Sequence, residues 1–135
     1  MSPGLMNALV LPDVIAILPG EDITADGNGD GVDVSKFEAW GTLVCQAANI
    51  AGTTPTLDLK LQHSEDDGVA DAYADVTDGA LVQITDTLGL IQQLKVNLSS
   101  AKKYIRIVKD IGGTATPRFF AGVALVAFRK DRSQA

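Results

Sequence analysis

Residues 56–63 read Thr-Leu-Asp-Leu-Lys-Leu-Gln-His, and this octapeptide decides the fold class. Leucine occupies every second position from Leu57 to Leu61, and the side chains between these leucines are polar. A period of two with one apolar face is typical of a half-buried β-strand, because successive side chains of a strand point to opposite faces of the sheet. A helix would spread these leucines around its circumference. The octapeptide therefore predicts a strand with one face in a core.

Short apolar runs separated by turn residues recur along the rest of the chain. We expect further strands at residues 14–18, 36–49, 72–76, 81–85, 91–98, 104–109 and 118–128. Residues 52–55 (Gly-Thr-Thr-Pro) and the Gly112-Gly113 pair are turn signals. Roughly eight or nine short strands predict an all-β fold, an antiparallel β-sandwich of the jelly-roll type. Residues 87–98 also fit helical spacing, so a helix there stays an open alternative.

The length of 135 residues suits one domain. Residues 1–12 have no clear period and include Pro3 and Pro12, so we expect an extended N-terminal arm that becomes ordered on a partner. Residues 13–130 are expected to form a single β-sandwich domain, and residues 131–135 a C-terminal tail.

The charge balance argues against several classes of partner. The chain carries a formal net charge of -6 with 11 basic residues, and its densest basic groups are Lys102-Lys103 with Arg106 and the tail residues Arg129, Lys130 and Arg132. Binding to nucleic acid or to an anionic membrane requires clustered basic side chains, so we expect neither partner. The apolar stretch at residues 8–18 is too short to span a bilayer and lacks the basic start of a signal peptide. The single cysteine, Cys45, has apolar neighbours and is expected to be a buried, inert thiol.

A glycine-rich hexapeptide, Asp-Gly-Asn-Gly-Asp-Gly, begins at Asp26 within a polar loop expected at residues 21–33. It matches the first half of a calcium-binding loop, in which Asp26, Asn28 and Asp30 would supply oxygen ligands. The twelfth position of such a loop should be Glu, but here it is Phe37. A polar turn is therefore the favoured interpretation, and a calcium site remains the alternative.

Acidic residues gather after the octapeptide, at Glu65, Asp66, Asp67, Asp71, Asp75 and Asp78. No histidine or arginine accompanies them in sequence, so a solvated loop is the main interpretation, and an acidic patch that meets a basic partner is the alternative. His63 is the only histidine, and one histidine without cysteine neighbours cannot form a typical zinc site. The sequence offers no complete set of catalytic residues and no cofactor motif, so we expect a protein that is not an enzyme.

The strand expected at residues 118–128 is apolar on both faces, which predicts either burial on both sides or contact with a partner. Aromatic side chains often anchor protein interfaces. The interface candidates lie in this strand, in the arm and in the acidic loop: Phe120, Phe128, Leu9, Leu11, Glu65, Asp66 and Asp67.

The stretch from Gly52 to Asp66, GTTPTLDLKLQHSED, resembles a segment of small structural proteins of tailed bacteriophages. Residues 75–78 (DVTD), 102–108 (KKYIRIV) and 112–114 (GGT) follow in the same order, so the resemblance covers roughly residues 33–128. These proteins are similar to jelly-roll cement or decoration proteins of capsids. The resemblance implies a virion protein on the outer capsid surface, and it implies no catalytic residues.

The leading hypothesis from the sequence is therefore a cement protein made in the host cytoplasm. It would bind the major capsid protein, stabilise contacts between the subunits of that protein, and act as a homodimer or homotrimer. One alternative is a tail or head-tail structural protein. Another is a calcium- or carbohydrate-binding β-sandwich module.

Overall fold

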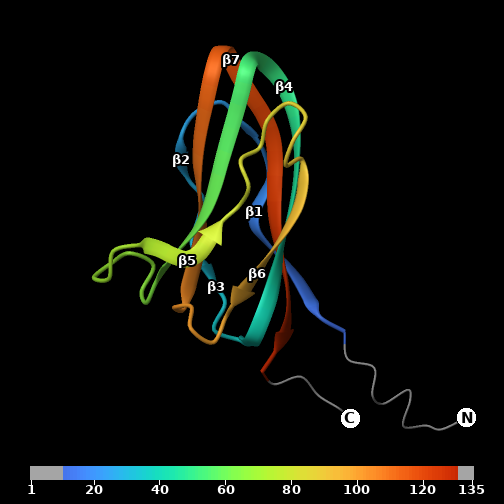
Figure 1. The fold of residues 1–135 in the computed structure, drawn as a ribbon. Coiled ribbons are helices and arrows are strands. Elements are labelled where there is room, and N and C mark those ends of the chain that lie inside the picture. Colours follow the sequence, from blue (N-terminus) through green and yellow to red (C-terminus); the bar gives the residue numbers. More distant parts are fainter. Residues whose placement is uncertain (1–10, 131–135) are drawn as a thin grey trace, which may run out of the picture.

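A computed structural model of the chain describes residues 11–130 (Figure 1). These residues form strands and connecting loops, and no helix among them is long and apolar enough to cross a membrane. The strands are β1 (Asp13–Ile23), β2 (Gly27–Asn28), β3 (Val32–Asp33), β4 (Phe37–Ser64), β5 (Ala74–Ala80), β6 (Ile91–Asn97) and β7 (Tyr104–Arg129). The strands of the described residues pair antiparallel, and the predicted all-β fold is confirmed.

Two long strands organise the molecule. β4 and β7 pair along their whole length, from Phe37 opposite Arg129 to Ser64 opposite Tyr104. Both bend at the top of the molecule, so that the two-stranded ribbon runs up one side and down the other (Figure 1). We expected one separate strand on each side of each turn signal, and that expectation was wrong. The pairing continues through the bend with register shifts, so each pair of expected strands is one bent strand.

Glycines make the bend sterically accessible. Gly52 and Gly113 have φ angles of 115° and 114°, which side chains rarely tolerate. A Cβ atom on Gly52 would lie 2.7 Å from Cα of Pro117, and one on Gly113 would lie 2.9 Å from Cα of Pro55. Each glycine therefore faces a proline of the other strand at close range, and the ribbon can fold over.

The folded ribbon gives a two-layer sandwich. The first layer is ordered β1, then the second half of β7, then the first half of β4, then β6. The second layer is ordered β2 and β3, then the first half of β7, then the second half of β4, then β5. This arrangement is a jelly-roll-like sandwich.

The core lies between the two layers and is filled by alternate side chains. The leucines of the octapeptide, Leu57 to Leu61, are at most 1% exposed. From the first layer, Leu43, Phe119 and Leu125 meet them with no exposed area. The half-buried strand predicted at residues 56–63 is thus confirmed, and Cys45 is buried in the same core.

Several local expectations change. The helical alternative at residues 87–98 is wrong, because residues 91–97 form β6 and pair with β4. The loop expected at residues 21–33 instead contains the end of β1 together with β2 and β3. Residues 72–76 and 81–85 are not two strands: β5 spans Ala74–Ala80, and Ile84 makes only an isolated bridge to Leu57.

Candidate functional site

The outer face of the first layer is apolar at its centre. Two outward side chains of β4, Thr42 and Gln46, are polar but uncharged. The apolar outward side chains of β1, β4 and β7 are Val14, Ala16, Val44, Ala48, Phe120, Ala124, Val126 and Phe128. We call this set the apolar face. Val14 is 65% exposed, Phe120 49% and Phe128 39%. Cross-strand pairing places Val14 next to Val126 and Ala16 next to Ala124, so the side chains form a continuous surface with strands about 4.8 Å apart.

Charged residues stand only at the margins of the apolar face. Residues 42–50 of β4 and 119–128 of β7 include no Asp, Glu, Lys or Arg. Lys95 and Glu38 lie toward the lower end, where Lys95 is opposite Thr42. At the upper end Arg118 donates to Asp22 at 2.6 Å. This hydrogen bond lowers the pKa of Asp22 below its usual value.

A hollow of about 370 Å³ opens on the apolar face. It is lined by Gly20, Gln46, Ala47, Ala48, Phe120 and Gly122. The two glycines lie close together, because a Cβ atom on Gly122 would be 3.1 Å from Cα of Gly20. Near Gly20 the register of β1 against β7 shifts. Because neither glycine has a side chain, a depression remains beside the exposed ring of Phe120. This depression suits an inserted apolar side chain.

The outer face of the second layer is polar. Lys60 and Asp75 are joined by a salt bridge of 3.1 Å, and Arg106 donates to Gln62 at 2.8 Å. Asp110 lies close to Asp26, whose negative charge raises the pKa of the Asp110 carboxyl group. This face therefore consists of paired polar side chains, and it lacks the continuous apolar surface of the first layer.

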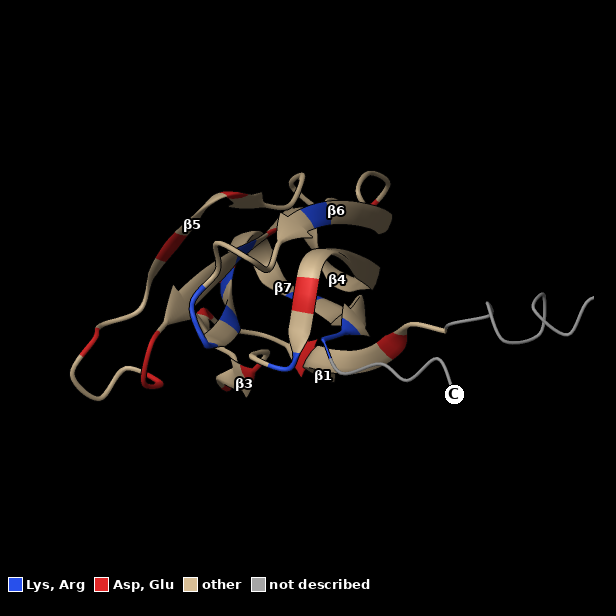
Figure 2. Ribbon diagram, turned by 90° about the horizontal axis from the view of Figure 1, so that it is seen from below, with Lys and Arg blue, Asp and Glu red and all other residues tan. Residues whose placement is uncertain are grey.

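The acidic loop after β4 is tied together from within. The Asp66 carboxylate accepts hydrogen bonds from the amides of Val69, Ala70 and Asp71 at 2.9 to 3.1 Å, and these bonds lower the pKa of Asp66. The Asp71 carboxylate accepts a hydrogen bond of 2.8 Å from Nζ of Lys102. Asp66 therefore orders the loop, and its carboxylate is already engaged. Figure 2 shows acidic segments along this loop.

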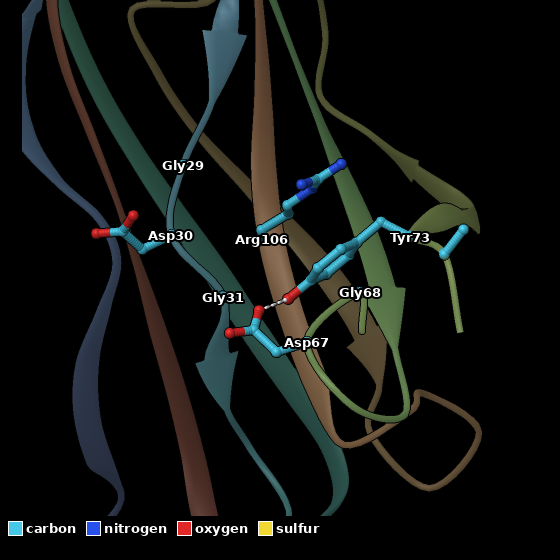
Figure 3. Close-up of a pocket in the computed structure, with 8 residues that line it drawn as sticks. Gly29, Asp30, Gly31, Asp67, Gly68, Tyr73 and Arg106 are labelled. Carbon is cyan, nitrogen blue, oxygen red and sulfur yellow. Dashed lines mark hydrogen bonds between the residues drawn. The ribbon is translucent and has the colours of Figure 1, made fainter. Parts of the chain in front are cut away.

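Asp67 points back onto the body of the protein. Its carboxylate accepts a hydrogen bond of 2.6 Å from the Tyr73 hydroxyl (Figure 3). The Arg106 guanidinium lies 4.0 Å from the centroid of the Tyr73 ring. Burial and the Asp67 carboxylate raise the pKa of Tyr73. A Cβ atom on Gly31 would lie 2.1 Å from the Asp67 carboxylate, so the loop closes directly on the backbone at Gly31. Among the acidic interface candidates, Glu65 and Asp67 are exposed and Asp66 is partly buried.

The calcium-loop candidates are stretched out along a sheet edge. Gly27 and Asn28 pair with β7, and the Gly29 amide donates to the Ile107 carbonyl at 2.7 Å. The Asp26 carboxylate accepts a hydrogen bond from the Ile111 amide at 2.7 Å. A calcium loop coils its ligands around one centre, whereas this segment is extended. Among residues 11–130, no three His, Cys, Asp or Glu side chains gather as a metal site.

A separate cleft of about 360 Å³ lies between the edges of the two layers. Trp40, which is 55% exposed, and Lys95 line it from the first layer, and His63 and Asp78 line it from the second. The His63 Nδ1 atom accepts a hydrogen bond of 3.2 Å from the Lys102 amide. Burial and the charge of Lys102 lower the pKa of His63, so His63 is neutral near pH 7.

The cysteine is remote from these surfaces. Cys45 has no exposed area, and burial raises the pKa of its thiol to about 11. A thiol of this kind is a poor nucleophile at neutral pH.

The structure places the interface candidates in different regions. Phe120 and Phe128 lie on the apolar face, and Leu11 is 74% exposed just before β1. Leu9 lies outside the described residues. Sequence reasoning missed the contributions of Val14 and Ala16 to this face. It also missed the hollow, because nothing in the sequence signals that Gly20 and Gly122 meet.

Comparisons with known proteins bear on the fold. No protein-family profile matches the chain, and no curated protein matches it. Among solved structures, the SPBc2 prophage-derived protein YomS matches with 13% identity and a TM-score of 0.52. That match covers 89% of this chain and 98% of YomS.

A second match is the structure of the CBM22-1 and GH10 modules of xylanase 10B from Clostridium thermocellum, complexed with xylohexaose. The identity is 8% and the TM-score is 0.50. The match covers 92% of this chain but only 26% of the xylanase chain. At such identities these likenesses show a shared β-sandwich fold.

Proposed function

We propose that this chain is a structural phage protein that binds the outer capsid surface and stabilises contacts between major capsid protein subunits. The observation that carries the proposal is the apolar face, an exposed surface without charge at its centre. Exposed apolar patches of this kind mark protein interaction sites. The resemblance of residues 52–66 to phage structural proteins and the fold likeness to prophage-derived YomS support the phage context.

The physical role follows from mass action. A protein that binds only the assembled shell stabilises that shell against dissociation. Copies that associate with one another bind the repeating subunits of a shell more tightly, because the second contact becomes intramolecular. The proposal therefore includes self-association as a homodimer or homotrimer. It assigns the protein no catalytic role and places it on the outside of the virion after synthesis in the host cytoplasm.

The experiment is sedimentation of the protein with DNA-filled particles built from its own major capsid protein. We expect the wild-type protein to sediment with the particles and to raise the temperature at which they release DNA. Deletion of residues 1–12 should weaken retention. Location on the tail by electron microscopy would favour the alternative of a tail or head-tail protein. Absence from all particles would overturn the proposal.

A second candidate function is carbohydrate binding, which the cleft beside Trp40 favours. An exposed aromatic ring next to polar groups can bind a sugar by stacking and hydrogen bonding. Trp40 is the only tryptophan, so its fluorescence reports on the cleft directly. Titration with xylohexaose should change this fluorescence if the candidate is correct. Because Trp40→Ala removes the fluorescent ring, calorimetry with xylohexaose is the measurement for the variants. Trp40→Ala should abolish binding, and Phe128→Ala, which alters an exposed aromatic residue on another surface, should not.

A further inference from the structure

The apolar face needs a cover that is itself apolar and uncharged. Its central strands carry no charged residue over residues 42–50 and 119–128. Contact with a charged segment would remove that charge from water without a partner, which is costly. The margin of the face has Lys95 and Glu38 together with two ion pairs, Arg118 with Asp22 and Arg129 with Asp13. It is thus electrically balanced, although the whole chain carries -6.

The N-terminal segment of the chain has the matching composition. Residues 1–10 read Met-Ser-Pro-Gly-Leu-Met-Asn-Ala-Leu-Val and contain no charged side chain. Leu5, Met6 and Leu9 are large apolar residues whose side chains suit the hollow beside Phe120. A second copy that presents this segment brings no acidic side chain to the face, so the net negative charge of the protein does not oppose the contact.

The length of the segment also fits. Ten extended residues span at most about 33–36 Å. The apolar face runs from Val14 to the level of Asp22, eight residue steps along β1, or roughly 26 Å at about 3.3 Å per residue. The segment is therefore long enough to lie along the whole face and to reach the hollow.

The described residues next to the segment are extended and exposed. Leu11 is 74% exposed, and residues 11 and 12 form no turn before β1 begins at Asp13. Pro12 holds the preceding residue in an extended conformation. A segment that covered its own face would have to reverse direction before β1, and residues 11 and 12 form no such turn.

We propose that residues 1–10 of one copy lie across the apolar face of a neighbouring copy, with an apolar side chain inserted into the hollow lined by Gly20, Ala48, Phe120 and Gly122. This arm exchange deepens the proposed function and rests on it: the arms link copies to one another, and the acidic loop with Glu65 is left to contact the capsid.

The test is disulfide trapping between two singly substituted full-length proteins. Leu9→Cys places a thiol in the arm, and Ala48→Cys places one beside the hollow. Disulfide formation needs the two Cα atoms within about 7 Å, and Cys45 does not compete because it is buried. Asp58→Cys is the matched control, since Asp58 is also exposed on β4 but belongs to the second layer.

We expect the mixture of Leu9→Cys and Ala48→Cys proteins to form a covalent heterodimer at least tenfold faster than the mixture with Asp58→Cys. Equal rates would overturn the proposal. A second outcome would also overturn it. If a protein that carries both Leu9→Cys and Ala48→Cys forms an intramolecular disulfide at high dilution, the arm covers its own face.

A second measurement uses sedimentation equilibrium. Leu9→Asp should raise the dissociation constant for self-association at least tenfold, whereas Asn7→Asp, which adds the same charge at a polar position, should change it less than threefold. Equal effects of the two variants would contradict a specific apolar contact. Both experiments need no capsid, so a negative result is distinguishable from failure of the capsid-binding proposal.

Discussion

The two outer faces of the sandwich are built from the same two strands, yet their surfaces differ. In the second layer, β4 and β7 present Lys60, Arg106 and Asp110 to solvent. In the first layer, the same strands present Val44 and Phe120, with no charge between residues 42 and 50 or between 119 and 128.

Both outer faces come from the same two strands, so folding alone does not require one face to be polar and the other apolar. One face of each layer already fills the core, and a polar second face would satisfy the fold equally well. An apolar second face adds a risk of aggregation unless a partner covers it. The asymmetry therefore supports the proposal that the first layer carries an interaction surface.

The largest expected effect is a loss of stability that distinguishes an inward side chain of β7 from its outward neighbour. Phe119→Ala should destabilise the fold by about 3–5 kcal/mol, because Phe119 is fully buried. Phe120→Ala, one residue on, should cost the isolated monomer about 1 kcal/mol or less, since Phe120 is 49% exposed. Urea unfolding at low protein concentration measures both. Similar losses for the two variants would mean that residue 120 belongs to the core.

The bend that creates both faces is the next point to test. Gly113→Ala should cost about 1–3 kcal/mol, because φ is 114° and the new Cβ would lie 2.9 Å from Cα of Pro55. Gly27→Ala is a suitable control, as a Cβ there meets only the Lys109 side chain at 3.7 Å. Thermal unfolding provides the comparison, and an unchanged melting temperature for Gly113→Ala would contradict the described bend.

A matched pair of substitutions tests the two faces directly. Val126→Lys on the apolar face should weaken self-association at least tenfold, or about 1.4 kcal/mol. Val108→Lys, at the same kind of outward position of β7 in the second layer, should leave it nearly unchanged. Analytical ultracentrifugation measures the association. If Val108→Lys is the more disruptive variant, the interaction surface lies on the second layer.

The smallest expected effect concerns the acidic loop. The pKa values of Asp66 and Asp71 are lowered, in each case first by hydrogen bonds that the ionised carboxylate accepts. Their contribution to loop order is therefore present above the usual aspartate pKa of about 3.9 and is lost as pH falls through the lower folded-state values. Amide NMR shifts of Ala70 and Asp71 should stay constant from pH 7 to 5 and change only below about pH 4. A transition near pH 6 would contradict this account.

Much of the fold was predictable from local pattern. The alternation of residues 56–63 required a strand with one buried face, and the leucines are buried. Residues 118–128 are apolar on both faces, and the structure buries only the inner one, with Phe120 49% exposed; contact of the outer face with a partner stays a prediction. The Asp26 to Gly31 pattern was less informative. It predicted a polar turn, with a calcium loop as the alternative, because residue spacing does not reveal whether the backbone coils or extends. Here pairing with β7 keeps it extended.

The sequence by itself determined the all-β class, the strand at residues 56–63 with its buried leucines, and the apolar character of residues 118–128, because a period of two is a local property of the backbone. Only the tertiary structure decided that β4 and β7 bend as one ribbon, that Gly20 meets Gly122, and that Val14 and Phe120 share a face. These are contacts between residues far apart in the chain, and they depend on how the ribbon folds over, which local pattern does not encode.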